Sequence, residues 1–266
     1  MLKDITLGQY YPSESVVHKL DPRNKIFLTF VFIIVIFLIE KLYGFIVLAV
    51  FTIIFTKISK IPLKVMLKGL KPILFIMIFT SVLNLFMTDG EVLWQFYFLK
   101  LTKEGLYLSA FMLVRVMFLV IASSFLTYTT SPIAMTAGLE SLMQPLKKIK
   151  FPAHEIAMMM SIALRFIPTL IEEADKIMSA QKARGANLSE GGLIKRAKAL
   201  IPILIPLFIS AFRRADELAV AMESRCYNGG EGRTRLNELK YTKNDLIAVL
   251  VFLFFLAIII LLNYIS

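Results

Sequence analysis

The sequence predicts an all-α membrane protein with about five transmembrane helices. It also predicts three membrane-proximal cytoplasmic helices inserted between the fourth and the fifth span. Hydrophobic residues make up 58% of the 266 residues, which is more than soluble domains usually carry. Five long apolar stretches divide the chain. The net charge of +11 is concentrated between those stretches, as is typical of loops that face the cytoplasm.

The apolar stretches cover residues 26–39, 42–56, 72–88, 105–127 and 246–262. A span needs about 20 residues, at 1.5 Å each, to cross a hydrocarbon core of about 30 Å. The first two stretches are shorter, but one straight helix through both would be about 46 Å long. We therefore expect a hairpin that turns at Glu40-Lys41. Whether these two helices cross the membrane completely stays open.

Lysine and arginine counts predict the orientation. The first 25 residues carry four, residues 57–71 carry five, and residues 128–243 carry seventeen. The alternate loops carry one and two, and the C-terminal tail carries none. We therefore expect a multi-pass protein of the cell membrane with a cytoplasmic N-terminus and Ser266 outside. Residues 1–127 would hold four spans, residues 128–243 a cytoplasmic coupling domain, and residues 244–266 the fifth span.

Two long helices are expected within the cytoplasmic insert, over residues 154–184 and 193–225. The runs 156–160 and 201–209 are apolar on every helical face, so they must be buried or contact lipid. Charges return toward the end of each helix. These helices would therefore begin against the membrane and end in water.

A shorter helix is expected before them, over residues 131–144. Thr130 or Ser131 is placed to cap it, and Pro145 is placed to stop it. Prolines inside the long helices should bend or break them; they are Pro168, Pro202 and Pro206.

The two long helices end in an internal repeat. After a shift of 41 residues, 174–184 lies over 215–225, with alanine, aspartate, alanine and arginine identical, and Asn187 matches Asn228 beyond. Each helix is then expected to stop at glycine, at Gly185 and at the pair 229–230. Chance similarity between alanine-rich helices with basic ends is the plainer explanation. The functional one is that Arg184 and Arg225 anchor two equivalent helix ends in two equivalent sockets.

Residues for catalysis are scarce. No phosphate-binding loop is present, the only histidines are His18 and His154, and the single cysteine excludes a cysteine metal cluster. Glu172-Glu173 is expected to lie on a solvated helix face. Arg115, inside a span, marks either a translocation path or a paired structural arginine.

Several motifs together resemble one family. They are His18–Lys25 before the first span, Thr129–Pro132, Gly138–Glu140, Leu164–Pro168, Ala180–Gly185, and Ser224–Cys226 followed by Tyr227. The chain is similar over nearly its whole length to the transmembrane T component of energy-coupling factor (ECF) transporters. These transporters import vitamins and cobalt or nickel.

The resemblance implies a non-catalytic subunit without a cofactor of its own. Two cytoplasmic ABC-type ATPases would bind ATP and Mg, and a small membrane S component would bind the substrate; no nucleic acid is expected among the partners. The residues implied to dock on the ATPases are Ala183, Arg184, Gly185, Ser224, Arg225 and Cys226. The residues expected to contact the S component are Met158, Met159, Met160, Ile203 and Leu204. The alternatives are a self-contained secondary transporter or channel that uses Arg115 and, with less support, a membrane enzyme.

Overall fold

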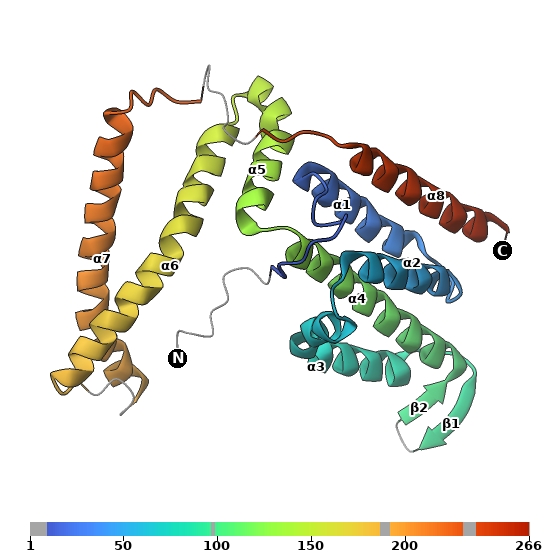
Figure 1. The fold of residues 1–266 in the computed structure, drawn as a ribbon. Helices are drawn as coiled ribbons and strands as arrows, with labels where there is room; N and C mark the ends of the chain where they lie inside the picture. The colour runs from blue at the N-terminus through green and yellow to red at the C-terminus, as the bar shows by residue number, and fades with distance from the viewer. Residues whose placement is uncertain (1–9, 97–98, 187–191, 231–237, 266) are drawn as a thin grey trace. The chain divides into compact units, whose positions relative to one another are not determined.

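A computed structural model describes residues 10–96, 99–186, 192–230 and 238–265. The chain is mainly helical over these residues (Figure 1). It forms two compact units. The span unit comprises Gly8–Ser141 and Glu238–Ser266, and the helix-pair unit comprises Leu142–Asn237.

All five apolar stretches form helices of the span unit, as predicted. They are α1 (Pro22–Leu38), α2 (Gly44–Ser59), α3 (Leu63–Met87), α4 (Lys103–Thr129) and α8 (Lys243–Ile265). The expected hairpin between the first two helices is confirmed, because α1 ends before Glu40 and α2 begins after Lys41. The N–H of Gly44 donates to the carbonyl of Lys41 at 3.1 Å and closes the turn.

Length and composition qualify four of the described helices as membrane spans, and these are α3, α4, α6 (Ala153–Ala183) and α8. The helices α1 and α2 have only 17 and 16 residues. As single helices they are about 25 Å long, which is short of the hydrocarbon thickness. The helix α6, expected beside the membrane, is therefore also apolar and long enough to cross it.

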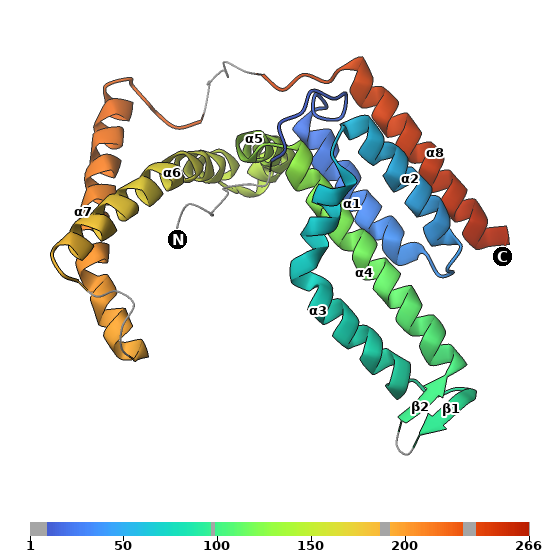
Figure 2. The same ribbon diagram turned by 60° about the horizontal axis from the view of Figure 1, so that its bottom comes forward.

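The helix α4 lies between α3 on one side and α1 with α2 on the other, and α8 packs on α1 and α2 (Figure 2). Phenylalanines fill the centre of this unit. The ring of Phe45 lies 5.2 Å from that of Phe111 and 6.0 Å from that of Phe118. The rings of Phe51 and Phe255 stack at 4.1 Å. Such ring pairs stabilise packing beyond the area that they bury.

A two-stranded hairpin joins α3 to α4 and was not expected. Antiparallel strands β1 (Val92–Phe96) and β2 (Leu99–Thr102) form it. The hydroxyl of Thr102 donates to the carbonyl of Thr88 at 2.8 Å and accepts from the N–H of Gly105 at 3.0 Å. Thr102 thus closes the end of α3 and caps the start of α4.

The predicted helices of residues 128–243 also form. They are α5 (Pro132–Met143), a 3₁₀ turn (Gln144–Ile149), α6, and α7 (Leu193–Glu223). The N–H of Ala134 donates to the hydroxyl of Ser131 at 3.3 Å, so Ser131 is the cap of α5. The long helices continue through all three prolines. The alternative that a proline breaks one of them is therefore wrong.

Candidate functional site

The two long helices α6 and α7 form an antiparallel pair (Figure 1). The side-chain amide of Gln181, near the end of α6, donates to the carbonyl of Pro202 at 3.3 Å. Earlier in α6, Glu173 contacts Ser210, which lies later in α7. Contacts that run in opposite directions along the two helices establish the antiparallel arrangement.

Glu173 braces the pair and does not lie on a solvated face, as the sequence led us to expect. Both of its carboxylate oxygens accept hydrogen bonds from α7. One accepts from the hydroxyl of Ser210, and the other from the guanidinium of Arg214 at 2.7 Å. Ser210 is buried, so this contact lies between the helices. Its neighbour Glu172 is exposed.

The end of α6 is closed by a Schellman motif. Gly185 has a φ of +85°, a conformation that glycine adopts without steric cost. Its N–H donates to the carbonyl of Lys182, and the N–H of Ala186 donates to the carbonyl of Gln181, both at 3.0 Å. This pair of bonds is the standard way to satisfy the last carbonyls of a helix.

The end of α7 is closed by the same motif. Cys226 has a φ of +55°. Its N–H donates to the carbonyl of Glu223 at 2.8 Å, and the N–H of Tyr227 donates to the carbonyl of Met222 at 3.0 Å. The helix therefore stops at Cys226, and the prediction that the glycine pair 229–230 stops it is wrong. A non-glycine residue in this conformation costs about 1–2 kcal/mol.

The sequence repeat is thus also a repeat of backbone structure. Every donor and acceptor of the first cap has its counterpart 41 positions later. Arg184 and Arg225 each stand directly before the left-handed residue, and both are exposed. The flanking Ala183 and Ser224 are exposed too. The further match at Asn187 lies outside the described residues.

The two arginines stand at opposite ends of the helix pair, because the helices are antiparallel. Figure 1 shows the C-terminal end of α6 near the start of α7, while α7 ends at the far end. Gln181 contacts Pro202, and Arg225 lies 23 positions beyond that proline. At 1.5 Å per residue, the two tips are about 35 Å apart along α7.

The residues expected to contact a membrane partner differ in exposure. Met159, Met160 and Leu204 are exposed, and Met158 is half-buried. Ile203, by contrast, is only 5% exposed, so its side chain is buried and does not contribute to this surface. Further apolar side chains of α7 are exposed and widen this surface; they are Ile201, Ile205, Phe208, Ile209 and Phe212.

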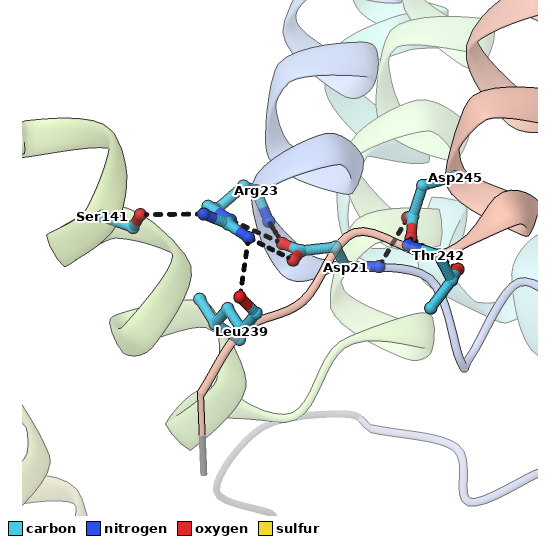
Figure 3. A network of polar contacts seen from close by, with 6 residues as sticks. All are labelled: Asp21, Arg23, Ser141, Leu239, Thr242 and Asp245. Atoms are coloured by element: carbon cyan, nitrogen blue, oxygen red, sulfur yellow. Dashed lines mark hydrogen bonds and ion pairs between the residues drawn. The ribbon is translucent and has the colours of Figure 1, made fainter. Parts of the chain in front are cut away.

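The motif before the first span forms a polar joint (Figure 3). The Arg23 guanidinium pairs with the Asp21 carboxylate at 2.7 Å. It also donates to the carbonyl of Leu239 at 3.1 Å and to the hydroxyl of Ser141 at 3.4 Å. The backbone N–H of Asp21 donates to the buried carboxylate of Asp245 at 2.8 Å. This network joins the starts of α1 and α8 to α5.

Lys25 and His18 extend the joint to the end of α4. The Lys25 ammonium donates to the carbonyls of His18 and Thr129, both at 2.9 Å. The His18 ring bonds to the Ser15 hydroxyl at 2.7 Å and to the Tyr11 carbonyl at 3.0 Å. Burial lowers the pKa of His18, and the charge of Lys25 lowers it further, although the Tyr11 carbonyl opposes both effects.

Gly138 lets α5 approach α1 closely. A Cβ at this position would lie 3.0 Å from the Cβ of Pro22 and 3.1 Å from the Cδ1 of Ile26. The Gly138–Glu140 motif therefore belongs to the same joint. Within the described ranges, no group of three histidine, cysteine, aspartate or glutamate side chains is placed to hold a metal ion.

Arg115 binds the end of α1. Its guanidinium donates to the carbonyl of Ile39 at 2.6 Å and lies 4.5 Å from the centre of the Phe111 ring. A cation at the C-terminal end of a helix meets the negative end of the helix dipole. Of the two interpretations left open by the sequence, the geometry favours the paired structural arginine.

Comparisons with known proteins agree over nearly the whole chain. The family model CbiQ, described as "Cobalt transport protein", matches residues 13–236. A protein of Ruminiclostridium cellulolyticum is 54% identical over 265 residues, which cover 100% of this chain and 99% of the relative. A Bacillus subtilis protein is 46% identical over 263 residues, covering 96% and 99%. Both are named "Energy-coupling factor transporter transmembrane protein EcfT".

Proposed function

Because the chain belongs to the EcfT family, the transmembrane components of energy-coupling factor transporters, we propose that it couples two ATPases to a substrate-binding S component. The ATPases would be cytoplasmic ABC-type subunits that bind ATP and Mg, while this chain would need neither a cofactor nor catalytic residues of its own. The S component would be a small membrane protein that binds a vitamin or a transition-metal ion for uptake.

The equivalence of the two helix ends carries the proposal. Arg184 and Arg225 follow the same cap geometry, and both are exposed. A guanidinium offers up to five donors in a planar fork, which suits carboxylate or carbonyl acceptors in a groove. The two equivalent helix ends match the two ATPase subunits in number. Each arginine would therefore dock on one ATPase. Their neighbours Ala183, Gly185, Ser224 and Cys226 would line the contact.

The antiparallel pair would carry the movement. The tips lie about 35 Å apart along α7, so two ATPases that approach each other would displace them in different directions. Glu173, bonded to Ser210 and Arg214, resists sliding of one helix past the other. A change at the tips would therefore move the helices together and shift whatever rests on them.

The exposed apolar side chains supply the second contact. Met158, Met159, Met160 and Leu204 would bear on the S component, with the neighbouring exposed residues of α7. Methionine side chains adapt to partners of different shape. Ile203 would support this surface from inside. Under the proposed topology, the N-terminus and the helix pair face the cytoplasm, where the basic segments belong.

The test removes both tips. Arg184→Ala/Arg225→Ala should insert into the membrane in normal amount but lose co-purification with the ATPases and lose uptake. Arg213→Ala is the matched control, since Arg213 is an exposed arginine of α7 away from the tips. A double variant that copurifies with the ATPases and supports uptake like the wild type would overturn the proposal.

A further inference from the structure

An apolar cavity of about 210 Å³ lies inside the span unit, between α1, α2, α4 and α8. Phe32, Phe51 and Phe252 are among the residues that line it. Lys25, in the first turn of α1, and Asn244, at the start of α8, also line the cavity. From Lys25 to Phe32 is about two helical turns, or roughly 11 Å. The cavity therefore extends from the helix ends into the span unit.

The cavity opens to the outside of the span unit. Several lining side chains are themselves exposed on the outside of the unit; they are Val16, Ile58, Ile247 and Val251. A cavity of this volume has room for about seven waters. Ordered water needs two to four polar partners. Away from the helix ends the lining offers only the hydroxyls of Thr29 and Thr52, and that of Thr52 already donates to the carbonyl of Leu48. Hydrocarbon is the better filling for most of the space.

A buried cation borders this apolar space. Lys25 is only 7% exposed, and its ammonium makes two hydrogen bonds, both to uncharged carbonyls. An ammonium carries three donors. Among residues of the described ranges, none offers it a carboxylate within 4 Å. The carboxylates of Asp245 and Asp21 also act on this ammonium through space. Neither accepts a hydrogen bond from it, so its third donor is left for an anionic oxygen.

We propose that the cavity binds one acyl chain of an anionic phospholipid, whose phosphate lies at Lys25. The chain would pass between the exposed lining residues and end near the phenylalanines. Under the proposed topology this lipid belongs to the cytoplasmic leaflet. The binding itself depends only on the span unit and not on the coupling function.

Ala248→Leu tests the site by occupying its space. Ala248 lines the cavity and makes no polar side-chain contact there. Ala257→Leu is the matched control, because Ala257 lies on the same helix, is exposed and is not part of the lining. The larger leucine of Ala248→Leu should displace about two methylene groups of the lipid chain from the cavity. That loss weakens the affinity about tenfold.

The full chain, purified in detergent and stripped of lipid, would be titrated with phosphatidylglycerol, phosphatidylcholine and oleate, and bound lipid measured by native mass spectrometry. The wild type and Ala257→Leu should bind one phosphatidylglycerol, about tenfold more tightly than Ala248→Leu does. Equal affinity in Ala248→Leu would overturn the site. Phosphatidylcholine has the same phosphate, but its choline balances the charge, so equal affinity for it would overturn the preference for an anionic lipid. Preference for oleate would overturn the phospholipid. The wild-type comparison of head groups needs no variant, so it stands even if Ala248→Leu misfolds.

Discussion

Gly185 and Cys226 hold the same left-handed backbone conformation, with φ of +85° and +55°, at two helix ends that are 41 residues apart. One residue adopts this conformation freely and the other against a steric cost. The hydrogen bonds of the cap are nevertheless the same. What the two ends share is therefore the placement of the preceding arginine.

Substitutions at these two caps should change stability in opposite directions. Cys226→Gly removes the steric cost and should raise the free energy of unfolding by about 1 kcal/mol. Gly185→Val adds that cost and should lower it by about 1–2 kcal/mol, although a Cβ there meets no atom within 4 Å. Thermal unfolding of the purified protein measures both.

Gly192→Ala is the control for these variants. Gly192 is equally open, with no atom within 4 Å of a Cβ, but its φ is −68°. It should change stability only slightly. If Cys226→Gly is destabilising, the conformation assigned to this cap is wrong.

Breaking the brace between the long helices should separate assembly from uptake. Glu173→Ala removes the acceptor of both Ser210 and Arg214, so the helices could slide. The variant should still copurify with ATPases through its intact tips, while uptake falls several-fold. Glu172→Ala changes an exposed neighbour and should transport normally. Equal uptake in the two variants would show that the brace does not carry the movement.

Sequence patterns predicted the helices well because their causes are local. Apolar runs between charges define α3, α4 and α8, and a two-residue polar break was enough to predict the turn between α1 and α2. The repeat was visible because the residues before the caps are themselves similar. Hairpin β1–β2 was missed because its strands adjoin a span and are only five and four residues long, too short for an alternation to stand out.

What sequence could not predict depends on partners distant in the chain. The sequence alone predicts that Glu173 is a solvated acid. Only the packing of α6 against α7 brings Arg214 to it. Ile203 stands in a run that is apolar all round, so only the packing decides that it is buried and Leu204 exposed. Cys226 closes α7 because hydrogen bonding of the last turn outweighs the preference for glycine.

Acid should destabilise the joint around His18. Burial lowers the pKa of His18 below its ordinary value of 6.5, so the folded protein favours the neutral ring. The unfolded chain then binds more protons than the folded chain between these two pKa values, and stability rises with pH there. The contribution is complete above about pH 6.5 and is lost as the pH falls toward the folded value.

The melting temperature of the wild type should therefore drop between about pH 7 and pH 5, relative to that of His18→Gln. Glutamine keeps a polar side chain near Ser15 and Tyr11 but does not titrate. The difference between the two proteins, measured in the same buffers, isolates the histidine. A difference that instead grows in favour of the wild type at low pH would contradict the neutral, half-buried ring.

Replacement of Arg115 should reduce stability while leaving uptake by the folded protein intact. Arg115→Met keeps the length of the side chain but loses the bond to the Ile39 carbonyl, which should cost about 1–2 kcal/mol. Lys103→Met removes an exposed cation of the same helix and should leave both quantities unchanged. Thermal unfolding gives the first quantity, and uptake per assembled transporter gives the second. An Arg115→Met protein of normal stability that no longer supports uptake would contradict the structural role and favour a place on a translocation path.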